Sequence, residues 1–258
     1  MLIDTHTHLY AEQFDEDRAE MIQRAIDAGV EHFFLPNIDL ESIEGMYQLE
    51  KDYPGKMHAM MGLHPCSVKA DYKEVLQQIK MELDKRDFVA IGEIGMDLYW
   101  DKTFKNEQEE AFLMQVEWAE ERNIPIVIHS RETTQLLIDL LKSYGVGRSR
   151  GIFHCFGGSY EEAIQIIDMG FHLGIGGVST FKKSTLPEVL ERLPIDRLVL
   201  ETDSPYLAPS PKRGKRNESS FVVYIAQKLA DLKKISLEEL SRQTSKNSLE
   251  VFDIKAQP

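Results

Sequence analysis

Short apolar runs alternate with amphipathic stretches from one end of the chain to the other. Eight apolar runs have the length of strands, and they cover residues 2–6, 32–36, 57–61, 88–93, 125–129, 151–154, 171–175 and 197–202. Several of them are apolar at successive positions, as in 126–128 and 198–200, which is typical of parallel strands buried on both faces. The pattern therefore predicts a parallel sheet whose strands are connected by helices.

Helical periodicity fills the gaps between these runs. Apolar side chains recur on one helix face in 106–122 and in 131–144. Capping-box spacings mark two further helix starts, at Ser159 and Ser236. Eight strand–helix units and one extra helix over 236–252 predict an α/β fold, a TIM-type (β/α)₈ barrel in which residues 1–258 form a single domain with an extra C-terminal helix.

An open, doubly wound sheet is the alternative arrangement. Such folds bind dinucleotides through a glycine-rich turn directly after the first strand. Here the glycine cluster Gly174, Gly176 and Gly177 follows the seventh apolar run instead, and we interpret it as a tight turn. The barrel is therefore the favoured interpretation.

Composition narrows the class of protein. The 258 residues carry a net charge of −13, which argues against non-specific coating of DNA but leaves room for an enzyme that binds a few phosphates. Two cysteines exclude a disulfide scaffold and fit a reducing cytosol. The start has no signal-like segment, and no apolar run is long enough to span a bilayer, so we expect a cytoplasmic protein with no membrane contact.

Metal-ligating residue types gather where the predicted strands end. In a barrel these ends surround one mouth, where barrel enzymes keep their chemistry. His6 and His8 are two positions apart, so they share a strand face. The side chains at these ends are His6, His8, Glu93, His129, His154 and Asp203, and the loop after 57–61 adds His64.

Four histidines and two carboxylates at one mouth favour divalent transition metals such as Zn, Mn or Fe. Six ligands are too many for one catalytic ion with an open position, but they suit two ions about 3.5–4 Å apart. We expect Glu93 to bridge the two ions. The first ion then takes His6, His8 and Asp203, and the second takes His129 and His154.

Other candidates have simpler interpretations. Glu201 shares a strand face with Asp203, and we expect Asp203 to be the ligand because it lies nearer the mouth, with Glu201 as a structural carboxylate. We expect Cys155 to pack rather than to ligate, and Cys66 beside His64 is a weak candidate for a soft metal. Three histidines at strand starts are expected to be structural: His32, His58 and His172.

Possible substrate contacts follow the same strand ends. Arg131 lies two residues past His129 and can bind a phosphate, although a helix-face ion pair is the alternative. A basic run, interpreted either as a phosphate patch or as a solvated loop, contains Lys212, Arg213, Lys215 and Arg216. Aromatic residues able either to stack on bases or to cover the rim are Tyr99, Trp100, Phe181 and Tyr206.

An ordered set of motifs covers essentially the whole chain. The matching stretches lie at residues 3–9, 62–65, 90–97, 125–131, 154–158, 200–206 and 213–218. In this order they resemble the TatD family of metal-dependent deoxyribonucleases, within the amidohydrolase-type barrels. Two positions depart from the family pattern, Tyr10 and Ser219, and we expect them to affect substrate fit more than metal binding.

The resemblance implies a dinuclear site with the same six ligands and 3′→5′ exonuclease action on DNA, on single strands or 3′ ends, often with Mg²⁺ in assays. We expect a transition metal such as Zn²⁺ in the isolated protein and Mg²⁺ or Mn²⁺ during turnover. The expected catalytic residues are Glu93, Asp203 as proton acceptor, and His64 near the leaving oxygen. The expected substrate contacts are Arg131, Tyr206, Arg213 and Lys215.

Two rival functions remain open. Barrel and metals are shared by amidohydrolases, lactonases and aminoacyl-tRNA deacylases, so the fold does not separate a nuclease from these hydrolases. A non-catalytic metal-binding protein is the other rival, although structural sites usually have four ligands rather than six. Nothing in the sequence points to an obligate protein partner.

Overall fold

The computed structural model describes residues 1–145 and 150–255, so the predicted domain extends beyond the described residues at 146–149 and 256–258. Each of the eight predicted strand regions overlaps a strand of this part of the chain. The strands are β1 (Leu2–Asp4), β2 (Val30–Leu35), β3 (Met57–Ala59), β4 (Ile91–Asp97), β5 (Ile126–Arg131), β6 (Gly151–Phe153), β7 (His172–Ile175) and β8 (Leu198–Leu200).

A helix follows each strand, and α9 is the additional C-terminal helix that the sequence predicts. The helices are α1 (Arg18–Asp27), α2 (Ser42–Asp52), α3 (Tyr72–Leu83), α4 (Lys105–Arg122), α5 (Thr134–Tyr144), α6 (Tyr160–Asp168), α7 (Leu186–Arg192), α8 (Val222–Lys233) and α9 (Leu237–Val251). The predicted capping box is present at the start of α6. The Ser159 side chain accepts the backbone N–H of Glu162, and the Glu162 side chain accepts the backbone N–H of Ser159. Ser236 caps α9 by accepting the backbone N–H of Glu239 at 3.1 Å.

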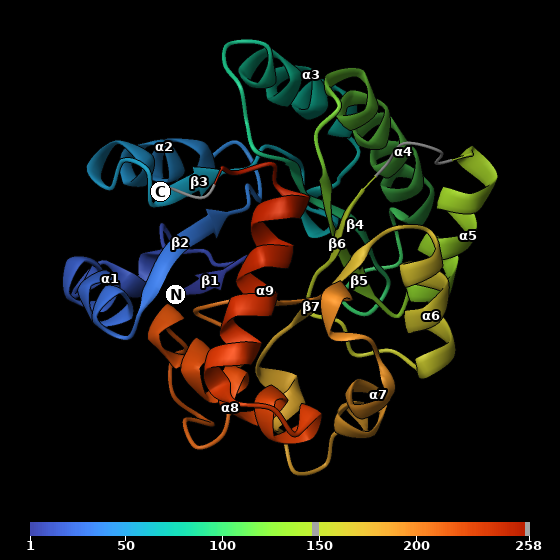
Figure 1. Cartoon of the computed structure of the whole chain (residues 1–258). Helices are drawn as coiled ribbons and strands as arrows, with labels where there is room; N and C mark the ends of the chain where they lie inside the picture. The colour runs from blue at the N-terminus through green and yellow to red at the C-terminus, as the bar shows by residue number, and fades with distance from the viewer. Residues whose placement is uncertain (146–149, 256–258) are drawn as a thin grey trace.

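The strands pair in parallel in two ladders, β1-β2-β3 and β4-β5-β6-β7-β8. Individual backbone hydrogen bonds join the ladders at both seams. Gly92 donates to Met61 at 3.1 Å on one side, and Asp203 donates to the carbonyl of His6 at 2.9 Å on the other. The strands therefore follow one another around a closed barrel (Figure 1), which excludes the doubly wound alternative.

Inward-pointing side chains fill the barrel from the end where the strands begin. This interior cluster includes Ile3, Phe34, Val127 and Val199, and the end of α9 closes it. The ring of Phe34 stacks on that of Phe252 just after α9, with 3.9 Å between centroids. Figure 1 shows α9 lying across this end of the barrel. The apolar plug leaves the opposite end, where the strands finish, for polar side chains.

No helix in the described ranges 1–145 and 150–255 combines the length and the apolar character needed to cross a bilayer. The amphipathic helices instead bury one face against the barrel, as α5 does with Leu137, Ile138 and Leu141.

Candidate metal centre

Glu93 lies at the middle of the polar cluster at the carboxyl end of the barrel. It sits on β4 and is 2% exposed. Its Oε1 lies 2.8 Å from Nδ1 of His129 and 2.8 Å from Nε2 of His154, and its Oε2 lies 3.0 Å from Nε2 of His6. Burial alone raises the pKa of this carboxyl, but the surrounding imidazoles, His154 and His6 first, hold it well below its usual range.

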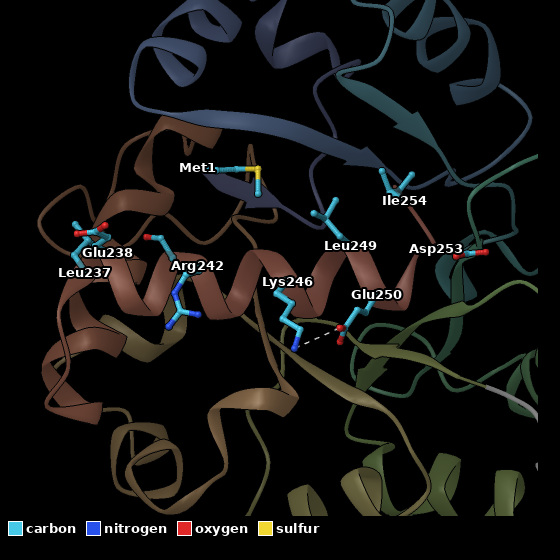
Figure 2. Close-up of a pocket in the computed structure, with 10 residues that line it drawn as sticks. Met1, Leu237, Glu238, Arg242, Lys246, Leu249, Glu250, Asp253 and Ile254 are labelled. Carbon is cyan, nitrogen blue, oxygen red and sulfur yellow. Dashed lines mark ion pairs between the residues drawn. The ribbon is translucent and has the colours of Figure 1, made fainter. Parts of the chain in front are cut away.

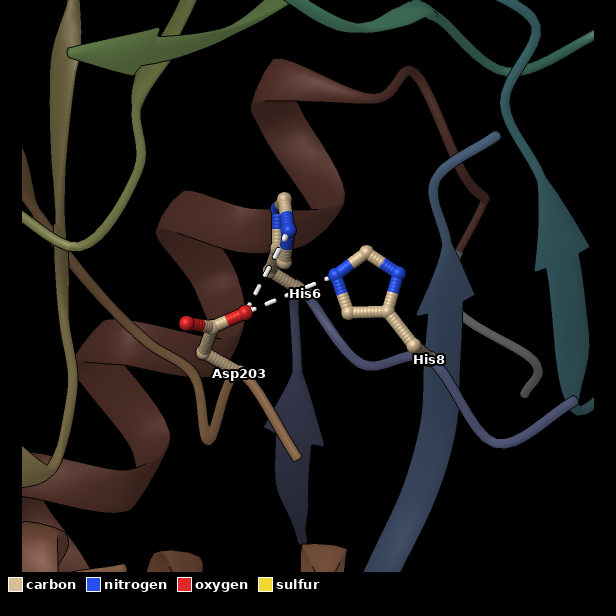
Figure 3. Close-up of side chains that lie close together, drawn as sticks. All are labelled: His6, His8 and Asp203. Carbon is tan, nitrogen blue, oxygen red and sulfur yellow. Dashed lines mark ion pairs between the residues drawn. The ribbon is translucent and has the colours of Figure 1, made fainter. Parts of the chain in front are cut away.

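A second carboxylate completes the cluster on the opposite side of His6. Asp203 follows β8 in a left-handed backbone conformation, with φ of 56°. Its Oδ1 lies 3.8 Å from Nε2 of His6 and 3.5 Å from Nε2 of His8, while its other oxygen points away from both rings (Figure 3). The two strand-end histidines thus face one carboxylate together, as their spacing predicts.

The donor atoms are spaced as a metal requires. Ligand atoms about 2.1 Å from a tetrahedral ion lie about 3.4 Å from one another. In each of three groups of the described residues, all donor atoms lie within 4.8 Å of one another: His6–His8–Asp203, His6–Glu93–His154 and His64–Glu93–His129. Glu93 offers one oxygen to His6 and the other to His129 and His154, so it faces both halves of the cluster.

Tyr10 determines the tautomer of His8. The hydroxyl of Tyr10 donates its one proton to the carbonyl of Pro36 at 2.5 Å. Toward Nδ1 of His8, 2.8 Å away, the hydroxyl therefore acts as an acceptor, and Nδ1 carries the proton. The lone pair on Nε2 then faces the cluster. Tyr10 was expected to bear on substrate fit more than on metal binding, and its hydroxyl also contacts a candidate ligand.

Asp97 determines the tautomer of His129. It follows Glu93 by four positions on β4, and its Oδ2 lies 2.9 Å from Nε2 of His129. Burial raises the pKa of Asp97, but the His129 hydrogen bond and two backbone N–H groups bring it to about 2. The carboxylate accepts Nε2–H, which leaves the Nδ1 lone pair free for a metal. No role in the site was predicted for Asp97, although its position on the same face of the strand as Glu93 is the signal that identifies it.

Glu201 stands behind His154. It is fully buried, its Oε1 accepts the backbone N–H of Cys155 at 2.6 Å, and the same oxygen lies 3.5 Å from Nδ1 of His154. Gly174 makes room for it, since a Cβ there would lie 2.1 Å from Oε2 of Glu201. Glu201 is thus the carboxylate behind a ligand, and Asp203 is the one that faces the histidine pair, as the sequence analysis expects.

His64 differs from His8 and His129 because its protonated nitrogen faces the cluster. Its Nδ1 accepts the backbone N–H of Cys66 at 3.0 Å, so the proton of the neutral ring sits on Nε2. That Nε2 lies 3.4 Å from Oε1 of Glu93. Burial lowers the pKa of His64, but the charge of Glu93 and the hydrogen bonds with Cys66 and Glu93 together outweigh burial, so the pKa is raised overall. A nitrogen that carries a proton is a donor rather than a metal ligand, which separates His64 from its neighbours.

A cavity of about 550 Å³ opens above these side chains, and its size is within the usual range for small-molecule sites. The lining includes His8, His64, Glu93, Arg131, Asp203 and Tyr206. Of the predicted substrate contacts, Arg131 and Tyr206 therefore border the cavity.

The remaining basic residues are placed differently. Arg213 and Lys215 are exposed on the loop after β8 and do not line this cavity, and the guanidinium of Arg213 stacks over Phe181 at 3.9 Å. Arg216 pairs with Asp17 at 2.7 Å. Within the basic run, Arg216 is therefore already ion-paired, and this pair links the loop to the segment before α1.

A larger cavity of about 860 Å³ lies at the other end of the barrel, along α9 (Figure 2). Its charged side chains include Lys246 and Glu250, which pair with each other at 3.6 Å. None of the three candidate metal groups of the described residues borders it. Size alone therefore does not identify the site.

Residues outside the centre behave mostly as structural ones. At the end where the strands begin, Nδ1 of His32 and Nε2 of His58 lie 2.9 Å apart, remote from the metal groups. Burial raises the pKa of the Cys155 thiol well above its usual range, which suits packing rather than ligation. Ser219, the second departure from the family pattern, is buried, and its hydroxyl lies 3.2 Å from that of Thr7.

Five imidazoles and two carboxylates in one cluster at the mouth of a (β/α)₈ barrel define the class of metal-dependent hydrolases with an amidohydrolase fold. The family described as TatD related DNase matches residues 3–253. The chain belongs to this family.

Individual relatives agree with this assignment. The metal-dependent hydrolase YabD of Bacillus subtilis (strain 168) is 42% identical over 98% of this chain and 100% of its own length. A protein of Pantoea ananatis named 3′-5′ ssDNA/RNA exonuclease TatD is 30% identical, over 98% of this chain and 100% of its length. The crystal structure of YjjV, a TatD homologue from Escherichia coli K12, superimposes with a TM-score of 0.92 at 29% identity, covering 98% of each chain.

Proposed function

We propose that this protein is a single-domain deoxyribonuclease that uses two divalent metal ions and releases nucleotides from the 3′ end of DNA. The observation that carries the proposal is the convergence of His6, His8, Glu93, His129, His154 and Asp203 in one cluster, of which all but the fully buried His6 line the mouth cavity. The Pantoea relative, named as a 3′-5′ exonuclease on single-stranded DNA and RNA, supports this substrate class. Cytoplasmic location stays a prediction.

The candidate ligands fit a pair of ions. His6, His8 and Asp203 would hold one ion, His129 and His154 the other, and Glu93 both. Bound ions would supply Lewis-acid polarisation of the phosphate and a lowered pKa for water. The chain positions the donors through Tyr10, Asp97 and Glu201, each of which lies against the second nitrogen of one imidazole.

Two side chains are proposed to assist the reaction, one as an acceptor of a proton and the other as a hydrogen-bond donor. Asp203 is a carboxylate whose pKa is lowered overall, because its contacts with the histidines outweigh burial, so it can accept the proton of the attacking water. His64 presents Nε2–H beside the cavity and can donate a hydrogen bond to the leaving oxygen. Arg131 at the rim can bind a phosphate oxygen. Arg213 and Lys215 are proposed to contact more distant phosphates.

The test is mononucleotide release from single-stranded and 3′-recessed DNA, with Mg²⁺, Mn²⁺ and Zn²⁺ supplied separately. Glu93→Ala is the control, and it is expected to lose bound metal and activity together. Metal-dependent release of single nucleotides from the 3′ end, absent in the control, supports the proposal. A protein that binds two ions but releases no nucleotide would overturn it and point to esters or amides, including aminoacyl-tRNA, as substrates.

A further inference from the structure

Three side chains form a cationic and aromatic rim on one side of the mouth cavity. The guanidinium of Arg131, at the end of β5, lies 3.9 Å above the ring of Tyr99 and 5.2 Å from that of Trp100. The two aromatic rings meet edge to face at 5.0 Å. Arg131 and Trp100 both line the cavity, within the same wall as His129 and Asp97.

The rim is fixed to the metal centre rather than carried on a free loop. Asp97, which orients His129 through one oxygen, accepts the backbone N–H groups of Tyr99 at 2.9 Å and Trp100 at 3.1 Å through the other. The backbone N–H of Leu98 donates to the carbonyl of Arg131 at 3.1 Å. The rings and the guanidinium therefore keep a set distance from the candidate ligands.

Trp100 is open to solvent. It is 69% exposed, whereas Trp118, the other tryptophan of the chain, is only 6% exposed. Across the part of the chain that the structure describes, no carboxylate pairs with Arg131 within 4.0 Å, so aromatic faces hold the guanidinium while the N–H groups at its edge remain available. A flat apolar surface beside a cation is complementary to a base next to a phosphate.

We propose that Trp100 and Arg131 form a subsite for one unpaired nucleotide, in which the indole stacks on the base and the guanidinium binds the neighbouring phosphate. Only an unpaired base presents a free face to an indole, because duplex bases are stacked inside the helix. The subsite therefore selects single-stranded nucleic acid, with little preference among bases, since every base has an aromatic face. This inference rests on the proposed nuclease function.

The experiment compares two octamers of equal phosphate charge on the metal-loaded protein: oligothymidylate and an oligomer of abasic tetrahydrofuran units. Trp118→Phe supplies a background in which Trp100 is the sole tryptophan. Stopped-flow fluorescence follows binding before hydrolysis. We expect the thymidylate to quench Trp100 and the abasic oligomer to leave its emission unchanged.

Kinetics provide the second measurement. In Trp100→Leu, the KM for oligothymidylate is expected to rise roughly five- to a hundredfold, the loss that one base stack implies, while the KM for the abasic oligomer stays unchanged. Trp100→Phe, which keeps a smaller ring, is expected to lose less. An equal change in KM for both oligomers, or no quenching by thymidylate, would overturn the subsite.

The two measurements separate this inference from the function on which it rests. Hydrolysis of oligothymidylate without quenching of Trp100 fluorescence would support the nuclease proposal and overturn the stacking subsite. Quenching without hydrolysis would support a base-binding subsite and overturn the nuclease proposal.

Discussion

The hydroxyl of Tyr10 accepts a hydrogen bond from Nδ1–H of His8 across 2.8 Å and thereby leaves the Nε2 lone pair facing Glu93 and Asp203. The acceptor role follows from the hydroxyl's own proton, which is donated to the carbonyl of Pro36. A residue that departs from the family pattern thus supports a candidate metal ligand.

Replacing Tyr10 by phenylalanine is expected to weaken metal binding about ten- to a hundredfold, the usual cost of losing such a supporting contact. The ring remains, so the fold should persist, but the tautomer of His8 is no longer held. Competition with a chromophoric chelator measures the affinity for Zn²⁺. Tyr144→Phe, at the end of α5 and away from the cavity, is the matched control. Equal affinities in both variants would contradict the role of Tyr10.

Asp97→Asn is expected to reduce metal affinity by a similar factor and to leave the loop that carries Trp100 in place. The amide can still accept the two backbone N–H groups, but it loses the charge that favours Nε2–H of His129. Metal titration measures the loss of affinity. Asp101→Asn, an exposed aspartate in the same loop, should change little. If Asp101→Asn were as damaging as Asp97→Asn, loop distortion rather than the orientation of His129 would be the cause.

The barrel and the candidate ligands could be predicted because both depend on local pattern. Continuous apolar runs mark parallel strands, and the ends of such strands must meet, so His6, Glu93 and His154 are brought together by topology alone. Strand boundaries were less accurate: the run at 88–93 contains only the start of β4, which extends from Ile91 to Asp97 because backbone pairing with β5 continues past the apolar positions.

Contacts made by the loops could not be predicted because they depend on the path of the chain between strands. Tyr10 is near His8 in the sequence, yet its role requires Pro36 at the end of the next strand. Arg216 belongs to a basic run, and only the course of the loop after β8 brings it to Asp17. A basic run in the sequence gives the number of cationic side chains. Which of them already form ion pairs depends on tertiary contacts.

Gly174→Ala is expected to destabilise the protein by about 1–3 kcal/mol, because overpacking at a filled position forces a shift of neighbouring groups. The added Cβ would lie 2.1 Å from Oε2 of Glu201, and the displaced carboxylate would disturb His154. Chemical denaturation with parallel metal analysis measures both effects. Gly157→Ala is the control, since its Cβ would meet only one backbone oxygen at 4.0 Å. A neutral Gly174→Ala would show that Glu201 has room to move.

His32 and His58, which lie together at the end of the barrel where the strands begin, predict a loss of stability in acid. Burial and the neighbouring His32 lower the pKa of His58 from 6.5 to about 4. Between these pH values His58 binds a proton in the unfolded chain but not in the folded one. The free energy of unfolding therefore falls as the pH drops from about 6.5 to 4. The contribution is on the order of 1–3 kcal/mol. His58→Gln should flatten this part of the curve relative to the parent protein, and identical slopes would rule the pair out as the cause.

His64→Asn is expected to retain metal and lose turnover. Nδ1 of His64 accepts the Cys66 N–H, so the nitrogen that faces Glu93 carries a proton and serves as a hydrogen-bond donor rather than a ligand. The asparagine oxygen can still accept the Cys66 N–H, but the donor at the Nε2 position is gone, and loss of one such donor to a developing negative charge lowers kcat by about 10²–10³-fold. His154→Gln, which removes a nitrogen 2.8 Å from Glu93, should instead lower the metal content. Inductively coupled plasma analysis of both variants, beside kcat, distinguishes the roles. If His64→Asn lost as much metal as His154→Gln, His64 would be a ligand and not a donor to the leaving oxygen.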